Sequence, residues 1–123
     1  MATVPSDIRQ TKLTREWSLG PVLAEREVDQ HTWLMAVRAD AGLGASLSLV
    51  RRLLGLRLAG YTTIVVDLGD ADRVTDAVVA ALMQCRRKLT VCDGVLVVAA
   101  QRPDVQRALA RAGLELAGEF DEP

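Results

Sequence analysis

Apolar residues in the second half of the chain form two continuous runs, and a helix-like pattern follows each of them. The runs, residues 62–68 and 95–100, are rich in β-branched residues and have the composition of strands covered on both faces of a sheet. Apolar positions then recur at helical spacing over 76–89 and 103–112. This alternation predicts parallel strands joined by helices, with 62–68 as a central strand.

The beginning of the first half predicts a hairpin. Apolar-rich runs at 22–28 and 32–38 are separated by Asp29, Gln30 and His31, a connection of hairpin length. We therefore expect two antiparallel strands that form one edge of the sheet.

After Gly42 and Gly44 the apolar pattern changes to a helical period. We expect this helix to begin after an N-cap at Ser46 and to end at Gly60. Four apolar residues recur at i, i+3, i+7 and i+11, on one face of this helix, and are predicted to form its core-facing stripe: Leu47, Val50, Leu54 and Leu58. Three further leucines widen the apolar arc beyond that stripe: Leu49, Leu53 and Leu56.

The helix over 76–89 has a capping residue and two distinct faces. Thr75 or Asp76 can cap its N-terminus. Its apolar arc is predicted to contain Val78, Val79, Leu82, Met83 and Leu89. The facing, exposed strip is predicted to contain Ala77, Ala81, Gln84 and Lys88.

The elements follow one another in the order β-β-α-β-α-β-α. This order predicts an α/β fold with a mixed sheet of four to five strands, opened by an N-terminal hairpin and continued by parallel strands joined by helices. We expect residues 1–19 to form an N-terminal tail, 20–118 the folded domain and 119–123 a C-terminal tail.

Charge and apolar run length exclude several classes of protein. The 123-residue chain has 15 basic and 16 acidic side chains, whereas a nucleic-acid-binding module needs a concentrated basic surface. The longest apolar runs fall far short of the roughly 20 residues of a membrane helix. The N-terminus lacks the pattern of a secretory signal. We therefore expect a cytoplasmic protein that binds neither nucleic acid nor membrane.

Residues for metal or phosphate chemistry are present but poorly arranged. Two cysteines and one histidine are too few for a zinc site, and Gly42-Leu43-Gly44 lacks the third glycine and the lysine of phosphate-binding loops. Four aspartates carry the oxygen ligands that Mg²⁺ prefers, although each suits a strand end, a turn or a helix start better: Asp67, Asp70, Asp72 and Asp76. We expect no metal and no cofactor.

Residues for nucleophilic catalysis are also isolated from one another. His31, the only imidazole, lies in the predicted hairpin turn, away from any nucleophile. Cys85 falls at the edge of an apolar arc and Cys92 near the end of its helix. No catalytic residue is predicted.

Four short motifs occur in an order and spacing that match a known family. They are Val-Val-Asp-Leu at 65–68, Ala-Leu-Met at 81–83, Gly-Val-Leu-Val-Val at 94–98, and Pro-Asp-Val-Gln-Arg-Ala-Leu-Ala-Arg-Ala-Gly-Leu at 103–114. With them, the stretch from 27 to 116 resembles the STAS domain, the family of bacterial anti-sigma factor antagonists and of the cytoplasmic domains of sulfate transporters. The resemblance implies a STAS-like fold.

The resemblance also implies a phosphorylation switch that this chain lacks. In the antagonists, an Asp-Ser-Ser-Gly-type motif opens the second helix, and its second serine is phosphorylated by a serine kinase that is also the anti-sigma factor. The ungapped match puts this motif on 75–78 and the acceptor on Ala77, which has no hydroxyl. Asp76 can imitate a phosphate charge, and Thr75 is the remaining candidate for phosphorylation.

The same match places the expected partner surface. Gly42 stands where an aspartate of the family often contacts the anti-sigma factor, and Asp40 can substitute for it. The predicted partner-binding residues are Asp40, Gly42, Thr75, Asp76, Ala77, Ala81, Gln84 and Lys88.

The resemblance leads to a functional hypothesis with two alternatives. We expect a non-enzymatic regulatory module that resembles an anti-sigma factor antagonist and binds an anti-sigma factor or related serine kinase. One alternative is a STAS domain that binds a small ligand, a nucleotide or a lipid, with the loops before the first and second helices lining its pocket. The other is a homo-oligomeric scaffold subunit that dimerises through Leu49, Leu53 and Leu56.

Overall fold

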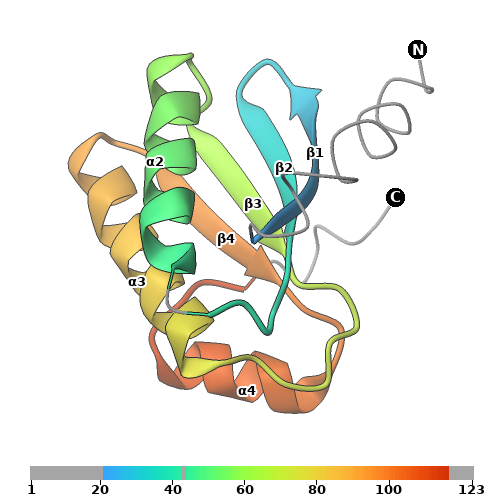
Figure 1. Cartoon of the computed structure of the whole chain (residues 1–123). Helices are drawn as coiled ribbons and strands as arrows, with labels where there is room; N and C mark the ends of the chain where they lie inside the picture. The colour runs from blue at the N-terminus through green and yellow to red at the C-terminus, as the bar shows by residue number, and fades with distance from the viewer. Residues whose placement is uncertain (1–20, 43, 117–123) are drawn as a thin grey trace.

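The computed structural model describes residues 21–42 and 44–116, and these form an α/β fold (Figure 1). The strands and helices, in chain order, are β1 (Val22–Asp29), β2 (Thr32–Val37), α2 (Ala45–Leu58), β3 (Thr63–Asp67), α3 (Asp76–Val91), β4 (Val95–Ala99) and α4 (Pro103–Arg111). The element order confirms the predicted one. The predicted tails, 1–19 and 119–123, lie outside the described residues.

The four described strands form one mixed sheet in the order β1-β2-β3-β4. β1 and β2 are antiparallel, whereas β2 pairs with β3, and β3 with β4, in parallel. The central position predicted for 62–68 is therefore confirmed, because β3 lies between two strands. Its three middle residues, Ile64, Val65 and Val66, are all buried, as expected of a strand covered on both faces.

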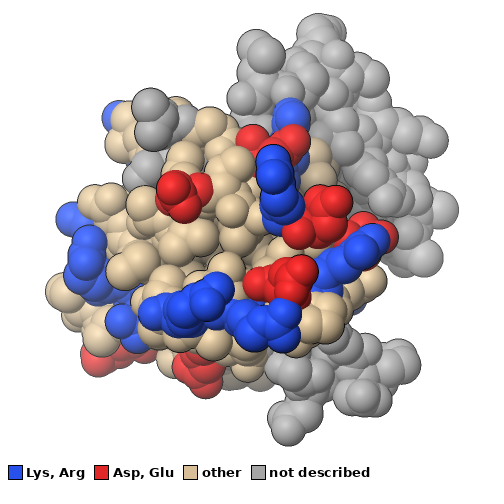
Figure 2. Space-filling model, turned by 90° about the horizontal axis from the view of Figure 1, so that it is seen from below, with Lys and Arg blue, Asp and Glu red and all other residues tan. Residues whose placement is uncertain are grey.

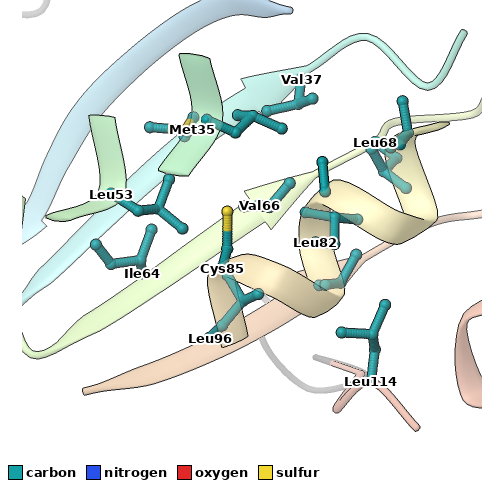
Figure 3. Packing of buried hydrophobic residues seen from close by; sticks show 14 of the residues in the cluster. Met35, Val37, Leu53, Ile64, Val66, Leu68, Leu82, Cys85, Leu96 and Leu114 are labelled. Atoms are coloured by element: carbon teal, nitrogen blue, oxygen red, sulfur yellow. The ribbon is translucent and has the colours of Figure 1, made fainter. Parts of the chain in front are cut away.

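The core is formed by the sheet and the three described helices. Helices α2 and α3 lie side by side over one face of the sheet, and α4 lies near the lower end in the view of Figure 1. Figure 3 shows side chains from β2, β3 and β4 meeting Leu53 of α2 and Leu82 of α3. The sheet contributes Met35, Val37, Ile64, Val66 and Leu96 to this cluster.

The predicted core-facing stripe of α2 is wrong for Leu47 and Leu58, whereas Val50 is partly buried and packs against the core. The leucines that lie in the core are those that were expected to be surplus: Leu49, Leu53 and Leu56, which are 0, 1 and 4% exposed. In the predicted stripe, Leu47 is 60% and Leu58 89% exposed. A dimer through Leu49, Leu53 and Leu56 is therefore excluded as long as the fold is intact.

Contacts outside the apolar pattern also join α2 to the sheet. Arg52 donates from Nε to both oxygens of Glu25 on β1, at 3.1 and 3.2 Å. Its guanidinium also lies over the ring of Trp33, 5.8 Å from the centroid. Arg52 contacts β1 in the same rotation of the helix that buries Leu49, Leu53 and Leu56.

The helix ends agree with the predicted caps in all but one case. Helix α2 has Gly44 as its N-cap, so the predicted cap, Ser46, lies inside the first turn. Gly60, predicted to end the helix, follows it with φ +114°, a conformation that favours glycine. Pro103 occupies the first turn of α4, where its missing N–H leaves no hydrogen bond unmade. No helix in the described ranges has the length and apolar composition needed to cross a membrane.

Candidate functional site

The segments that follow β2 and β3 meet at one end of the sheet. Both strands are parallel, so their carboxyl ends share an edge, which is where open α/β sheets form binding sites. The loop over 38–44 leads from β2 into α2, and the loop over 68–75 leads from β3 into α3. The lower part of Figure 1 shows this end of the molecule.

Thr75 joins the two loops. Its backbone N–H donates to the carbonyl oxygen of Ala39 at 2.9 Å, and its hydroxyl donates to the carbonyl oxygen of Ala41 at 2.9 Å. The same hydroxyl accepts a hydrogen bond of 3.2 Å from the N–H of Val78, which caps α3. The half-buried side chain of Thr75 therefore fixes both the start of the helix and the position of the β2–α2 loop.

These bonds bring five of the predicted partner-binding residues together. Asp40 and Gly42 flank the carbonyl that Thr75 binds, and both are exposed. Asp76 is exposed in the first turn of α3, whereas Ala77 is half-buried and not fully exposed as predicted. We call the surface formed by Asp40, Gly42, Thr75, Asp76 and Ala77 the loop surface.

The remaining three predicted residues do not belong to the loop surface. Ala81 was expected on an exposed strip, but it is 0% exposed and part of the core cluster. Its small side chain suits a helix that packs closely against its neighbours. Gln84 and Lys88 are exposed but lie about 12 and 18 Å along α3 from Asp76, at the helical rise of about 1.5 Å per residue.

The charges at this end of the molecule have both signs. Figure 2 shows this end, with arginine and lysine side chains interspersed with aspartate and glutamate. On the loop surface, the Asp40 carboxylate lies 3.4 Å from the Arg38 guanidinium. Arg102 donates from Nε to the carbonyl oxygen of Asp70 at 3.2 Å, which ties the β4–α4 connection to the β3–α3 loop.

Two of the four aspartates considered as magnesium ligands, Asp67 and Asp76, have structural roles. Asp67 accepts a hydrogen bond of 2.8 Å from the N–H of Gly69, a residue with φ +67° that makes the turn. Asp76 stands in the first turn of α3, where negative charge is favoured. Within the described ranges, no three side chains among His, Cys, Asp and Glu gather as they would to hold a metal ion.

The residues considered for nucleophilic chemistry differ in their surroundings. Burial raises the pKa of the Cys85 thiol to about 12, so it is protonated at neutral pH. Cys92 is exposed at the C-cap of α3. The backbone N–H of His31 donates to the Asp29 carboxylate at 2.8 Å, and this bond, together with smaller effects, lowers the pKa of Asp29; it also confirms the hairpin turn.

A second polar cluster was not predicted from the sequence. Glu25 accepts hydrogen bonds from both Arg52 and Trp33, whose Nε1 lies 2.9 Å from the carboxylate. The Trp33 ring lies 5.0 Å from the Tyr61 ring between centroids. Burial, and secondly the nearby Glu27 carboxylate, raise the pKa of Tyr61. No short-range pattern links these residues, because they come from β1, β2, α2 and the segment before β3.

A comparison of the sequence with protein-family models, and another with curated proteins, found no match.

Proposed function

We propose that this chain is a STAS-like, non-enzymatic regulatory module that binds a partner protein through the loop surface. The partner is an anti-sigma factor or a related serine kinase, as the resemblance to anti-sigma factor antagonists implies. In this proposal the module binds without phosphorylation control at the usual position, because Ala77 offers no hydroxyl to a kinase.

The hydrogen bonds of Thr75 carry the proposal. They hold the β2–α2 loop, with Asp40 and Gly42, against the start of α3, with Asp76 and Ala77. These are the two segments in which the resemblance places the partner contacts. They are separated by more than 30 positions in the chain, so their meeting in space does not follow from the sequence motifs.

The same bonds support a structural role for Thr75. Its hydroxyl already donates to Ala41 and accepts from Val78. A phosphoryl group on this oxygen would remove the proton that bonds to Ala41 and add about two negative charges beside a carbonyl oxygen. Thr75 is therefore a poorer phosphate acceptor than an exposed serine.

Substitution of Ala77 by glutamate tests the loop surface. The larger, charged side chain is expected to weaken binding of the cognate anti-sigma kinase at least tenfold, measured without ATP by titration calorimetry. The control is Ala110→Glu, which makes the same change at an exposed alanine of α4, outside the loop surface, and is expected to leave binding unchanged. If both variants bind like the wild type, the loop surface is not the binding site.

A further inference from the structure

Helix α2 carries a second apolar stripe that is not used by the core. Leu47, Leu54 and Leu58 recur at i, i+7 and i+11, so they share one side of the helix. Leu47 is 60% exposed, Leu58 is 89% exposed and Leu54 is half-buried. Single exposed leucines are ordinary on protein surfaces, but a stripe at helical spacing is typical of a helix that packs against a partner.

The end of α3 extends this apolar stripe. Val91, the last residue of α3, is 83% exposed. Arg57 of α2 donates from Nε to the carbonyl oxygen of Cys92 at 2.9 Å, so Leu58 and Val91 lie at the same end of the two helices. Figure 1 shows α2 and α3 side by side up to this end. We call the surface of Leu47, Leu54, Leu58 and Val91 the helix surface.

Most charged residues of α2 and of the second half of α3 are basic, although Arg52 is paired with Glu25 of β1 and the exposed Asp93 follows Val91 by two residues. Every charged residue of α2 is an arginine: Arg51, Arg52 and Arg57. Helix α3 has its one acidic residue, Asp76, in the first turn, and its second half carries Arg86, Arg87 and Lys88. A second copy of this chain on the helix surface would oppose like charges, whereas an acidic partner would complement them.

We propose that the helix surface binds an acidic amphipathic segment of another protein, with apolar side chains at helical spacing and aspartate or glutamate beside them. The apolar stripe supplies the contact area, and the arginines select the acidic segment. A membrane is a poorer occupant, because α2 contains none of the aromatic residues that anchor interfacial helices. One end of the helix surface, at Val91, lies about 22 Å along α3 from Asp76, whereas its other end, Leu47, lies in the first turn of α2, five residues after Gly42.

Two synthetic helical peptides test this proposal. Both carry leucines at i, i+4, i+7 and i+11; one has glutamates beside the leucines and its twin has lysines. We expect the full-length protein to bind the glutamate peptide saturably in a fluorescence anisotropy titration, and to bind the lysine twin at least tenfold more weakly.

Variants then locate the binding. Leu58→Ser is expected to weaken binding of the glutamate peptide at least fivefold, and it does not threaten the core because Leu58 is almost fully exposed. The matched control, Leu23→Ser, replaces a partly exposed leucine of β1 and is expected to bind like the wild type. The double variant Arg51→Glu, Arg87→Glu is expected to prefer the lysine peptide.

Four results would overturn the proposal. The first is equal binding of the two peptides, and the second is binding that Leu58→Ser leaves unchanged. The third is a dimer in sedimentation equilibrium that Leu58→Ser dissociates, which would make a second copy the occupant. The fourth is binding to phosphatidylserine–phosphatidylcholine vesicles that Leu58→Ser abolishes while the peptides do not bind, which would make a membrane the occupant.

Discussion

Thr75 has two structural roles, as the N-cap of α3 and as a contact to the β2–α2 loop, and its position in the sequence predicts only the first. A threonine immediately before a helical apolar pattern predicts an N-cap, and the bond from Val78 confirms it. Its bonds to Ala39 and Ala41 were not predictable, because the acceptors lie 36 and 34 positions away in the chain and depend on the pairing of β2 with β3.

We expect Thr75→Val to lower the free energy of unfolding by about 1–2 kcal/mol, because valine has the shape of threonine but cannot cap the helix or bond to Ala41. Urea denaturation measures the change. Thr75→Ser keeps the hydroxyl and is expected to stay within about 0.5 kcal/mol of the wild type. Equal destabilisation by both variants would mean that the hydroxyl contributes little.

The two cysteines differ in accessibility. Cys85 is 1% exposed with a pKa raised by burial, whereas Cys92 is exposed. We expect a chromogenic disulfide reagent to modify one of the two thiols in the native protein and both in denaturant. Fast modification of both thiols in the native protein would contradict the buried position of Cys85.

The raised pKa of Cys85 also predicts a dependence of stability on pH. The pKa is 9.0 in the unfolded chain and about 12 in the folded one, so the unfolded state loses this proton first as the pH rises. The thiol therefore favours unfolding between pH 9 and 12, by up to about 1.4 kcal/mol per pH unit. The difference in unfolding free energy between the wild type and Cys85→Ala is expected to shrink over this range.

At the scale of elements, α2 shows where apolar periodicity stops being informative. Its leucines form two stripes at helical spacing, one with Leu49, Leu53 and Leu56 and the other with Leu47, Leu54 and Leu58. From the spacing alone, each stripe could face the core. The choice between them depends on which stripe packs against the strands and α3, and the contact of Arg52 with Glu25 and Trp33 is compatible with only one of the two rotations. Such contacts between distant segments leave no trace in a local pattern.

A pair of alanine substitutions tests the observed rotation of α2. Leu53→Ala removes a side chain from the core and is expected to cost about 2–5 kcal/mol of unfolding free energy. Leu58→Ala makes the same change in the last turn of the helix, where the side chain is exposed, and is expected to cost less than about 0.5 kcal/mol. If Leu58→Ala lowered the unfolding free energy more than Leu53→Ala, the rotation predicted from periodicity would be correct and the observed one wrong.

At the scale of the whole molecule, the alternation of strands and helices predicted the topology correctly. The apolar runs at 62–68 and 95–100 became β3 and β4, paired in parallel, and the hairpin became an antiparallel edge. These features are predictable because burial on both faces imposes a composition that one short segment shows by itself. The residues of the loop surface were predicted one by one, but the contacts that join them were not. Ala81 was misplaced because a small residue is compatible with either a packed or an exposed face of a helix.

The two proposals assign a partner to each of two surfaces, the loop surface and the helix surface. The loop surface lies at the start of α3, whereas Leu58 and Val91 of the helix surface lie at the far ends of α2 and α3. The loop surface is central to the proposed function, and its defining feature is the alanine at position 77.

The most direct test of the proposed function compares the wild type with Ala77→Ser, each incubated with the cognate anti-sigma kinase and ATP. Size exclusion follows the complex and intact mass follows phosphorylation. We predict that the wild type stays bound with its mass unchanged, whereas Ala77→Ser gains the mass of one phosphate and dissociates. A wild-type chain that gains phosphate and leaves the kinase, or that never binds it, would contradict the proposal of an antagonist without the serine switch.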